Sequence, residues 1–513
     1  MASPARYNPH MPEYEPVIGL EVHAQLRTRS KMFCSCPADY QAAPPNTRVC
    51  PVCLGLPGTL PVINREAIRS IIMTGLALHC EIAEETKFDR KNYTYPDLMK
   101  GYQISQYDLP ICHDGYLDID VDGGRKRIGI ERVHMEEDVA KLFHRVDPAT
   151  GEGYSLVDVN RSGVPLMEMV GRPDLRSAEE ARTYLVAYRS ILQYLGVSTG
   201  SMEEGSFRCD ANVSLRPVGT SAFGTKVEVK NMNSFRAVFR AIEFEIERQS
   251  KRLERGERIA METRGWVEEK GITISLRSKE EANDYRYFPE PDLPPLHVAP
   301  AWIAELEELL PELPEPRKAR FMAADGAEGY GLSGYDASLL TDSPALADYF
   351  EEAVAAVRSG SSGSSGGSGN DAPKRVANWM MTALAAHLNA AGVEIGASPV
   401  RPAALAELLA LIEGGTLGTT QAKAALEAMY KSGKPAAQVV EELGLAQVTE
   451  RGEIASAVAQ AIAENPSAVA DFLGGKETAA KFLVGQVMKA TRGKANPGIV
   501  AELVAAQLGA LKQ

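Results

Sequence analysis

Hydrophobic and polar positions alternate over short runs in the first 295 residues, and Gly, Pro and Asn turns separate these runs. That pattern is typical of β-structure. The clearest run alternates apolar residues at Ile18, Leu20, Val22, Ala24 and Leu26. Successive side chains of a strand point to opposite faces, so the other face carries Glu21 and His23.

Two later runs repeat the alternation. One places Phe207, Cys209, Ala211, Val213 and Leu215 opposite Ser206, Arg208, Asp210, Asn212 and Ser214; the other places Val227 and Val229 opposite Lys226, Glu228 and Lys230. A sheet often turns a polar face to solvent, and each row taken alone fits that interpretation. Acids, a histidine and cations on one sheet are also what a metal–nucleotide site requires.

Helical spacing appears in two places. Residues 233–258 predict a helix that is capped by Asn233 or Ser234 and ends near Gly256. After residue 296 the chain becomes Ala- and Leu-rich, and its apolar residues recur at helical spacing. From about Thr416 we expect a separate domain with helices near 419–432, 435–443, 451–464, 466–473, 477–489 and 496–511.

These patterns predict an α+β protein with three parts: a β-rich domain over 1–295, an all-α middle domain over 296–415 and a small all-α tail over 416–513. The Ser/Gly-rich segment 359–369 is interpreted as a flexible linker. Such runs also form the nucleophile loop of amidase-signature hydrolases. That alternative needs an α/β core and a lysine partner, whereas Ala-rich helical sequence flanks this segment.

Composition narrows the classes of protein. The 513 residues are 44% hydrophobic and 24% charged, which excludes a mainly disordered chain. The net charge of −13 argues against a broad basic nucleic-acid surface, although a local basic site remains compatible with it. We see no membrane span and no targeting signal, and seven cysteines fit a reducing compartment. We therefore expect a cytoplasmic protein.

Four of the cysteines are closely paired, at Cys34, Cys36, Cys50 and Cys53. Two close pairs with prolines beside them predict a tetrahedral structural zinc site. Four sulfur ligands leave no open coordination position, so this zinc is expected to stabilise the fold. The alternative is four reduced thiols without a metal.

Three consecutive acids, Glu136, Glu137 and Asp138, follow an apolar strand pattern. Such a run is usually a solvated turn or the first turn of a helix. The sequence has no GxxxxGK[S/T] loop and no kinase Gly-rich loop, so any nucleotide site is of another type.

Several motifs together resemble the GatB/GatE family, to which the B subunits of bacterial tRNA-dependent amidotransferases belong. They include VIGLEVHAQL, YPDLMKGYQISQYDLPI, HMEEDVAK, DVNRSGVPLMEMV, MEEGSFRCDANVSLRP, KVEVKNMNSF and DYRYFPEPDLPPL, and the tail is similar to that family's YqeY-like domain. The resemblance covers essentially the whole chain except 359–369. The chain has no room for the large extra domain of the archaeal E subunits, so the bacterial B type is favoured.

The resemblance implies a cradle-shaped catalytic domain and a tRNA-binding tail. It also implies that ATP phosphorylates the side-chain carboxylate of Glu-tRNA(Gln) or Asp-tRNA(Asn), and that ammonia then displaces the phosphate. An amidase-type A subunit would supply the ammonia from glutamine, and a small C subunit would brace the heterotrimer. The implied cofactors are ATP and Mg²⁺, besides the structural zinc.

The resemblance also implies residue roles. Glu21, His23, Glu136 and Glu137 are expected to hold Mg²⁺ and to be catalytic, with Asp210 as a further catalytic residue. Ser206, Arg208, Asn212, Glu228, Lys230 and Asn231 are expected to bind ATP or the aminoacyl ester. YPDLMKGYQISQ and DYRYFPEPDLP are expected only to line the cradle. A non-catalytic tRNA-binding scaffold and a Mg²⁺-dependent hydrolase remain as alternatives.

Overall fold

The computed structural model describes residues 13–122, 124–278, 285–324, 329–360, 371–446, 451–491 and 495–511. The predicted linker at 359–369 lies almost entirely outside the described residues. The chain forms two compact units, Met1–Pro314 and Glu315–Gln513, which are described separately. No helix among the described residues is long and apolar enough to cross a bilayer.

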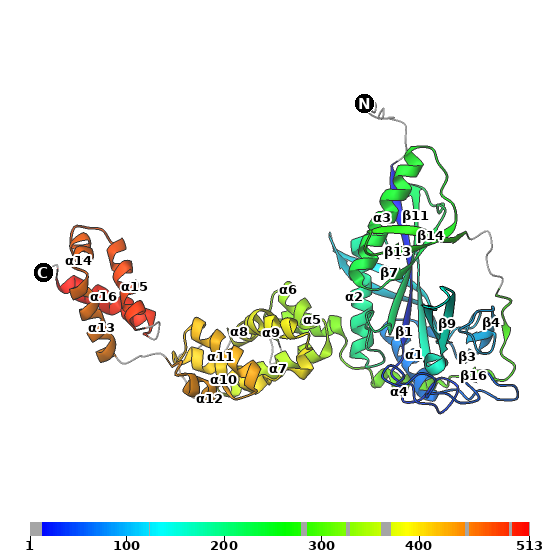
Figure 1. The fold of residues 1–513 in the computed structure, drawn as a ribbon, viewed down its shortest axis with the longest axis horizontal. Coiled ribbons are helices and arrows are strands. Elements are labelled where there is room, and N and C mark those ends of the chain that lie inside the picture. The colour runs from blue at the N-terminus through cyan, green and yellow to red at the C-terminus, as the bar shows by residue number, and fades with distance from the viewer. Residues whose placement is uncertain are drawn as a thin grey trace. The chain divides into compact units, whose positions relative to one another are not determined.

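A nine-stranded sheet organises the first unit (Figure 1). Its strand order is β14-β13-β12-β11-β1-β10-β7-β6-β2, so the first strand of the chain lies in the middle. The strands are β1 (Tyr14–Gln25), β2 (Glu81–Ile82), β6 (Cys112–Val121), β7 (Gly124–Glu137), β10 (Pro165–Gly171), β11 (Phe207–Pro217), β12 (Val227–Met232), β13 (Glu262–Val267) and β14 (Ile272–Ser278).

The predicted alternation of β1 is confirmed. Ile18, Leu20, Val22 and Ala24 are at most 1% exposed, and Leu26, directly after the strand, is 4% exposed. The strand pairs antiparallel with β11 on one side and β10 on the other, which sets Glu21 opposite Asp210 and His23 between Arg208 and Glu168. The register therefore aligns the polar rows of neighbouring strands on one face of the sheet.

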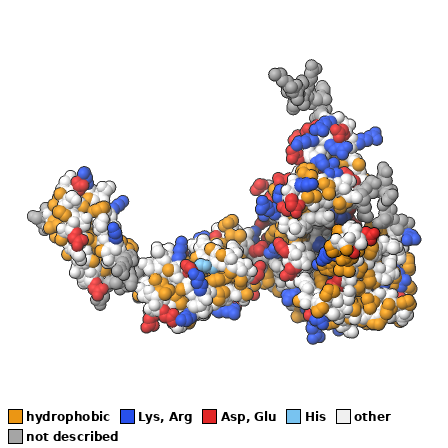
Figure 2. All heavy atoms as spheres, in the orientation of Figure 1, with side chains coloured by type: hydrophobic (Ala, Val, Ile, Leu, Met, Phe, Trp, Pro, Cys, Tyr) orange, Lys and Arg blue, Asp and Glu red, His pale blue; other side chains and the backbone are white. Residues whose placement is uncertain are grey.

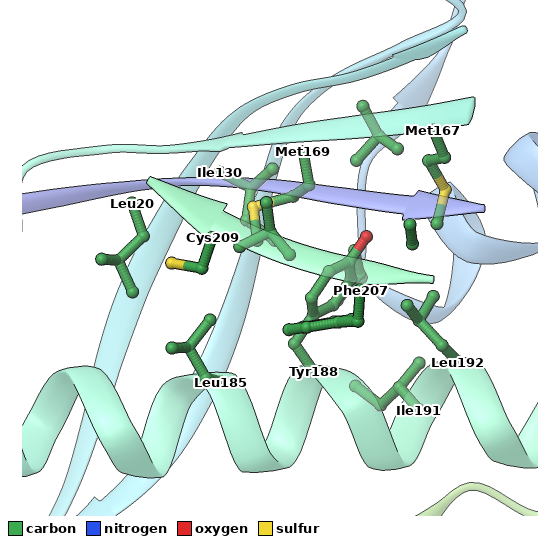
Figure 3. Close-up of a cluster of buried hydrophobic side chains, with 14 of the residues drawn as sticks. Leu20, Ile130, Met167, Met169, Leu185, Tyr188, Ile191, Leu192, Phe207 and Cys209 are labelled. Carbon is green, nitrogen blue, oxygen red and sulfur yellow. The ribbon is translucent and has the colours of Figure 1, made fainter. Parts of the chain in front are cut away.

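Three helices cover the apolar face: α1 (Arg65–Ala77), α2 (Ala178–Tyr194) and α3 (Phe235–Glu254). Figure 3 shows Leu185, Tyr188 and Leu192 of α2 packed beneath the strands that carry Leu20 and Phe207. The side chain of Ser234 accepts a hydrogen bond from the backbone of Ala237, so α3 confirms the predicted helix and selects Ser234 as its cap. The polar rows lie on the opposite face of the sheet, away from these helices.

A small sheet of order β15-β4-β5 lies against β7, formed by β15 (Phe288–Pro289), β4 (Asp89–Asn92) and β5 (Tyr102–Ser105). The backbone N–H groups of Ile104 and Met135 bond to side chains across this junction, on Glu137 and Gln106. Two further pairs complete the unit: β3 (Glu85–Thr86) with β16 (Leu296–His297), and β8 (Lys141–Val146) with β9 (Gly153–Asp158). Helix α4 (Pro300–Glu308) packs against α1.

The second unit is helical in the part that the structure describes. Its helices are α5 (Pro314–Met322), α6 (Gly334–Leu340), α7 (Pro344–Gly360), α8 (Ala372–Trp379), α9 (Ala385–Ala391), α10 (Pro402–Glu413), α11 (Thr419–Ser432), α12 (Ala436–Leu443), α13 (Arg451–Glu464), α14 (Pro466–Leu473), α15 (Thr478–Ala490) and α16 (Pro497–Ala510), with a π-helical turn at Met380–Leu384. The predicted tail helices are confirmed within two residues at each end. The α+β class is confirmed as well.

Two separate hydrophobic cores stabilise this unit. One runs from Phe321 to Val440, and the other from Ile454 to Leu508. Helices α11 and α12 belong to the first of these cores, although they follow residue 416, where we expected the tail domain to begin. The three-part division at 295 and 415 stays a prediction. On the face drawn in Figure 2, basic side chains are interspersed with acidic ones.

Candidate functional site

The polar face of the nine-stranded sheet gathers an imidazole and two carboxylates from three adjacent strands. His23 Nε2 of β1 lies 3.1 Å from Glu168 Oε2 of β10 and 3.9 Å from Glu136 Oε2 of β7. One ligand atom of each of the three residues lies within 4.8 Å of the others. Two carboxylates and an imidazole are donors that suit Mg²⁺ or Mn²⁺. We call these three residues the carboxylate–imidazole group.

The small sheet covers Glu136 with polar side chains. Glu136 is 2% exposed, and its carboxylate accepts hydrogen bonds from Ser105 Oγ at 2.8 Å, Gln103 Nε2 at 3.1 Å and Lys91 Nζ at 3.4 Å. Burial opposes ionisation, but Lys91 and the neighbouring His134 outweigh it and hold the pKa of Glu136 well below its usual value. The carboxyl group of Glu136 is therefore ionised at neutral pH.

Glu168 and His23 polarise one another. Burial and Glu136 act to raise the pKa of Glu168, yet His134 and His23 lower it to about 2. For His23, burial disfavours the cation, while Glu168 and Glu136 favour it more strongly and raise the pKa. A metal ion at this group would take the place of that proton.

The same face continues to the next two strands. Asn212 Nδ2 of β11 donates to Glu21 Oε1 at 3.0 Å, and Lys230 Nζ of β12 lies 2.5 Å from Asp210 and 3.3 Å from Glu228. Burial raises the pKa of Glu21, and Glu168, Asp210 and Glu228 raise it further. Glu21 therefore takes up a proton more readily than Glu136 or Glu168, whose pKa values are lowered.

Some buried polar atoms on this face have no hydrogen-bond partner among the described residues, and two of them lie near the acids. They are Nδ1 of His134 and Oδ1 of Asn212. Buried polar groups are nearly always paired, so an orphaned one indicates a bound water or ligand. Oδ1 of Asn212 can only accept, so it suits a hydrogen-bond donor or a metal ion, whereas Nδ1 of His134 donates or accepts according to its tautomer.

Glu137 and Asp138 do not join the carboxylate–imidazole group. Glu137 Oε1 accepts from Ile104 N at 3.0 Å and lies 2.5 Å from Lys100 Nζ. Asp138 accepts from Gln25 at 2.6 Å and from Arg208 at 3.0 Å. Interpreting the three acids as a solvated turn or as the start of a helix is wrong. Glu136 and Glu137 are the last residues of β7, Asp138 follows them, and each is at most 5% exposed.

The remaining predicted residues have local partners. Arg208 pairs with Asp138, and Ser206 Oγ bonds within the loop to Thr199 and Ser201. The register of β12 shifts opposite β11 at Asp210, which leaves Lys230 and Asn231 in a β-bulge. Asn231 has φ 66° and is exposed, while Lys230 points back to Asp210.

Our sequence analysis missed Glu168, together with Lys91, Gln103 and Ser105 of the small sheet. Glu168 interrupts an otherwise apolar strand, PLMEMV, in which four of the residues are buried around it. A single acid in a central strand was the available signal. Lys91, Gln103 and Ser105 gave no such signal, because their contact with Glu136 depends on how the small sheet packs against β7.

The four paired cysteines come together as predicted. Their sulfur atoms lie within 4.8 Å of one another, a spacing that could hold a metal ion. A hydrogen bond from Cys34 lowers the pKa of Cys53. Hydrogen bonds tie this loop to the segment before β10: Arg48 N donates to Asn160 Oδ1 at 2.7 Å, and Asn46 N donates to Asp158 Oδ1 at 3.1 Å.

Comparison with known proteins identifies the family. The model of the GatB/GatE catalytic domain matches residues 16–304, and a second model, the GatB domain, matches residues 364–508. The chain belongs to the GatB/GatE family. The catalytic-domain match contains every residue of the site described above.

Full-length relatives agree. The chain is 55% identical to the B subunit of the aspartyl/glutamyl-tRNA(Asn/Gln) amidotransferase of Dehalococcoides mccartyi strain CBDB1, over 96% of this chain and 99% of that protein. It is 53% identical to the B subunit of the same name from Carboxydothermus hydrogenoformans, over 98% and 100%. The B subunit of the same name from Thermomicrobium roseum is 52% identical, over 96% of this chain and 98% of that protein. Membership in the GatB/GatE family thus extends over both units.

Proposed function

We propose that this chain is the component of a tRNA-dependent amidotransferase that phosphorylates and then amidates the side chain of a misacylated tRNA. The substrates are Glu-tRNA(Gln), Asp-tRNA(Asn) or both, and ATP is the phosphoryl donor. The carboxylate–imidazole group carries this proposal, because anionic ligands beside lysines suit a metal–phosphate complex. The printed names of the relatives support the amidotransferase role.

In the proposal, His23, Glu136 and Glu168 would hold Mg²⁺, and Glu21 lies two residues before His23 on the same face of β1. When bound, Mg²⁺ would offset negative charge on the transferred phosphoryl group and on the acceptor carboxylate. Lys91 and Lys230 flank the row and attract phosphate oxygens. Glu21, with its raised pKa, takes up the proton that ammonia loses when the amide forms.

The two steps follow from the chemistry of carboxylates, which are poor acyl donors at neutral pH. Phosphorylation supplies a leaving group, and ammonia then displaces phosphate at the acyl carbon. We propose that an amidase-type A subunit releases this ammonia from glutamine and that a small C subunit completes the heterotrimer. We also propose that Cys34, Cys36, Cys50 and Cys53 hold a structural zinc ion.

A single assay tests the activity. The reconstituted three-subunit complex receives ATP, Mg²⁺ and each misacylated tRNA separately, and ATP cleavage is measured with amide formation. We expect cleavage to depend on a misacylated tRNA. ATP cleavage without tRNA would favour a hydrolase, and tRNA binding without cleavage would favour a scaffold.

A further inference from the structure

Four tyrosines form a connected aromatic set around the small sheet. Tyr107 stacks on Tyr287 with ring centroids 4.4 Å apart and planes 11° from parallel. Tyr285 lies 6.1 Å from Tyr287 and 5.7 Å from Tyr93, both in edge-on geometry. Tyr93 follows β4, Tyr107 follows β5, and the other two precede β15. We call these four residues the tyrosine cluster.

The tyrosine cluster borders the carboxylate–imidazole group. Lys91 Nζ lies 5.3 Å from the ring centroid of Tyr285 and 3.4 Å from Glu136 Oε1. The hydroxyl of Tyr93 donates to Gln103 Oε1 at 3.4 Å, and Gln103 Nε2 donates to Glu136. Lys91 and Gln103 therefore each link a tyrosine of the cluster directly to Glu136.

The cluster is partly open to solvent: Tyr107 is exposed, and the other three tyrosines are half-buried. Tyr107 is 57% exposed, so much of its surface lies in solvent. Between Tyr285 and Tyr287, Arg286 adopts φ 42°, a left-handed conformation that costs free energy in a residue other than glycine. Asn92 holds this strained turn, because its N–H bonds to Tyr285 O at 2.8 Å and its amide bonds to Arg286 O at 2.9 Å.

We propose that the tyrosine cluster is a stacking platform for an adenine ring. The inference rests on the proposed function, in which both substrates carry adenine: ATP as its base, and tRNA as the 3′-terminal adenosine that bears the amino acid. Aromatic side chains stack on nucleobases, and the adjacent lysine and acids are placed for the charged part of the same ligand. In this arrangement the tyrosine rings contact the base of the ligand, and the neighbouring lysine and acids face its charged part.

Base-free probes test the proposal on the three-subunit complex with Mg²⁺. Affinities are measured for ATP against inorganic triphosphate, and for tRNA against the same tRNA lacking its terminal adenosine. The variants are Tyr107→Leu and Tyr287→Leu, which remove a ring, and Tyr107→Phe and Tyr287→Phe, which keep it. Tyr154→Leu is the matched control, because Tyr154 is 48% exposed on β9 outside the cluster.

The Leu variants should weaken binding of one adenine-bearing probe by roughly 10- to 100-fold, as expected for one lost base–aromatic stack. Its base-free counterpart should bind as before, and the Phe variants should restore affinity. Loss with ATP assigns the platform to the nucleotide, whereas loss with intact tRNA assigns it to the terminal adenosine. Equal effects on base-bearing and base-free probes, or no effect on either, would overturn the proposal.

The proposed function can fail separately. If the wild-type complex binds ATP but never phosphorylates a misacylated tRNA, the activity proposal falls and the binding comparison still stands. Thermal unfolding of each variant, compared with Tyr154→Leu, identifies any loss of affinity that arises from misfolding. A variant that unfolds near the wild-type temperature and loses only adenine-dependent affinity supports the platform.

Discussion

Glu136 and Glu168 approach one imidazole from neighbouring strands, and both remain ionised although both are buried. A buried carboxylate normally keeps its proton, so the surrounding cations decide its charge. Lys91 acts on Glu136, and the two histidines act on both acids. His23 must be neutral to bind a metal ion, and the two carboxylates then face the single positive charge of Lys91, an excess of negative charge that suits a metal ion.

Glu168→Gln should remove a metal ligand while preserving size and shape. We expect phosphorylation of the aminoacyl group to fall by roughly a hundredfold or more, because a lost ligand forfeits several kcal/mol of transition-state stabilisation. Phosphoryl transfer measured in single turnover, together with Mg²⁺ titration, checks this. Glu131→Gln on the exposed side of β7 is the control and should behave as wild type.

Glu137→Gln should act differently from Glu168→Gln. Its carboxylate ties β5 to β7 through Ile104 N and Lys100, so the substitution removes a buried charge-assisted contact. We expect a loss of unfolding free energy of about 1–3 kcal/mol and a smaller fall in phosphorylation than for Glu168→Gln. Denaturant unfolding beside the same single-turnover assay measures both. A fall in phosphorylation as large as that of Glu168→Gln, with unchanged stability, would restore Glu137 as a metal ligand.

Single elements were predictable where the pattern was strong. The alternation of β1, the cap of α3 and the six tail helices follow from spacing and capping residues alone. The small sheet was not predicted, since β4 and β5 are four residues long and β15 is two. Strands this short carry too few residues to show a period, and their pairing is decided by tertiary contacts.

The cysteine loop offers a prediction for one element. Cys50→Ser should bring zinc well below about one ion per chain and lower solubility, because a site with four sulfur ligands loses affinity when one is removed. Elemental analysis of the purified protein measures the metal. Cys80→Ala, a buried thiol outside the loop, should retain zinc. Soluble and active wild-type protein without zinc would contradict the assignment.

The junction of α5 and α7 offers a pH-dependent prediction. Arg320 and Arg317 of α5 bond to Glu351 of α7 and outweigh burial, which lowers the pKa of Glu351 below its usual 4.5. A lowered carboxyl pKa adds stability above the unfolded-state value, and that stability is lost as pH falls through the folded-state value. Glu351→Gln should therefore cost about 1–2 kcal/mol at pH 7 and progressively less below pH 4.5.

Denaturant unfolding at several pH values tests this difference. The control is Glu352→Gln, which changes the next residue of α7, an exposed one, and should shift stability little at any pH. A cost for Glu351→Gln that stays constant down to acidic pH would show that the ion pairs contribute nothing.

At the scale of the whole molecule, the two helical cores determine where the chain can be shortened. Deletion from residue 416 would remove α11 and α12 from the core that runs from Phe321 to Val440. Ending the chain at 446 removes the core from Ile454 to Leu508 and leaves the other intact. We expect this shorter deletion to weaken tRNA binding while glutamine hydrolysis by the amidase partner remains measurable.

Filter binding of tRNA to the complex checks this expectation. The sequence gathers five basic residues between 476 and 494, which we expect to contact the tRNA; Arg492 and Lys494 lie outside the described residues. A matched variant replaces the other three, Lys476, Lys481 and Lys489, by Gln, which removes basic charge without deleting the domain. The slope of affinity against salt should fall if these lysines contact phosphates. Unchanged affinity for tRNA in both variants would show that the tRNA contact lies elsewhere.

The complete set of site residues could not be predicted from one sequence. The rows on β1, β11 and β12 were visible as alternations, but Glu168 and Lys91 join them only through the strand order and the covering small sheet. Residues far apart in the chain meet there, and no local pattern reports which distant strands become neighbours.

The central place of β1 also has a consequence for synthesis. Its pairing partners β10 and β11 end at Gly171 and Pro217, so the strand leaves the ribosome long before either exists. At typical elongation rates it waits roughly 10–40 s for β11 to be made. An unpaired alternating strand invites association with other nascent chains, and charged residues on one face discourage it. We therefore expect Glu21 and His23, on the polar face of β1, to discourage such association while the chain is being made.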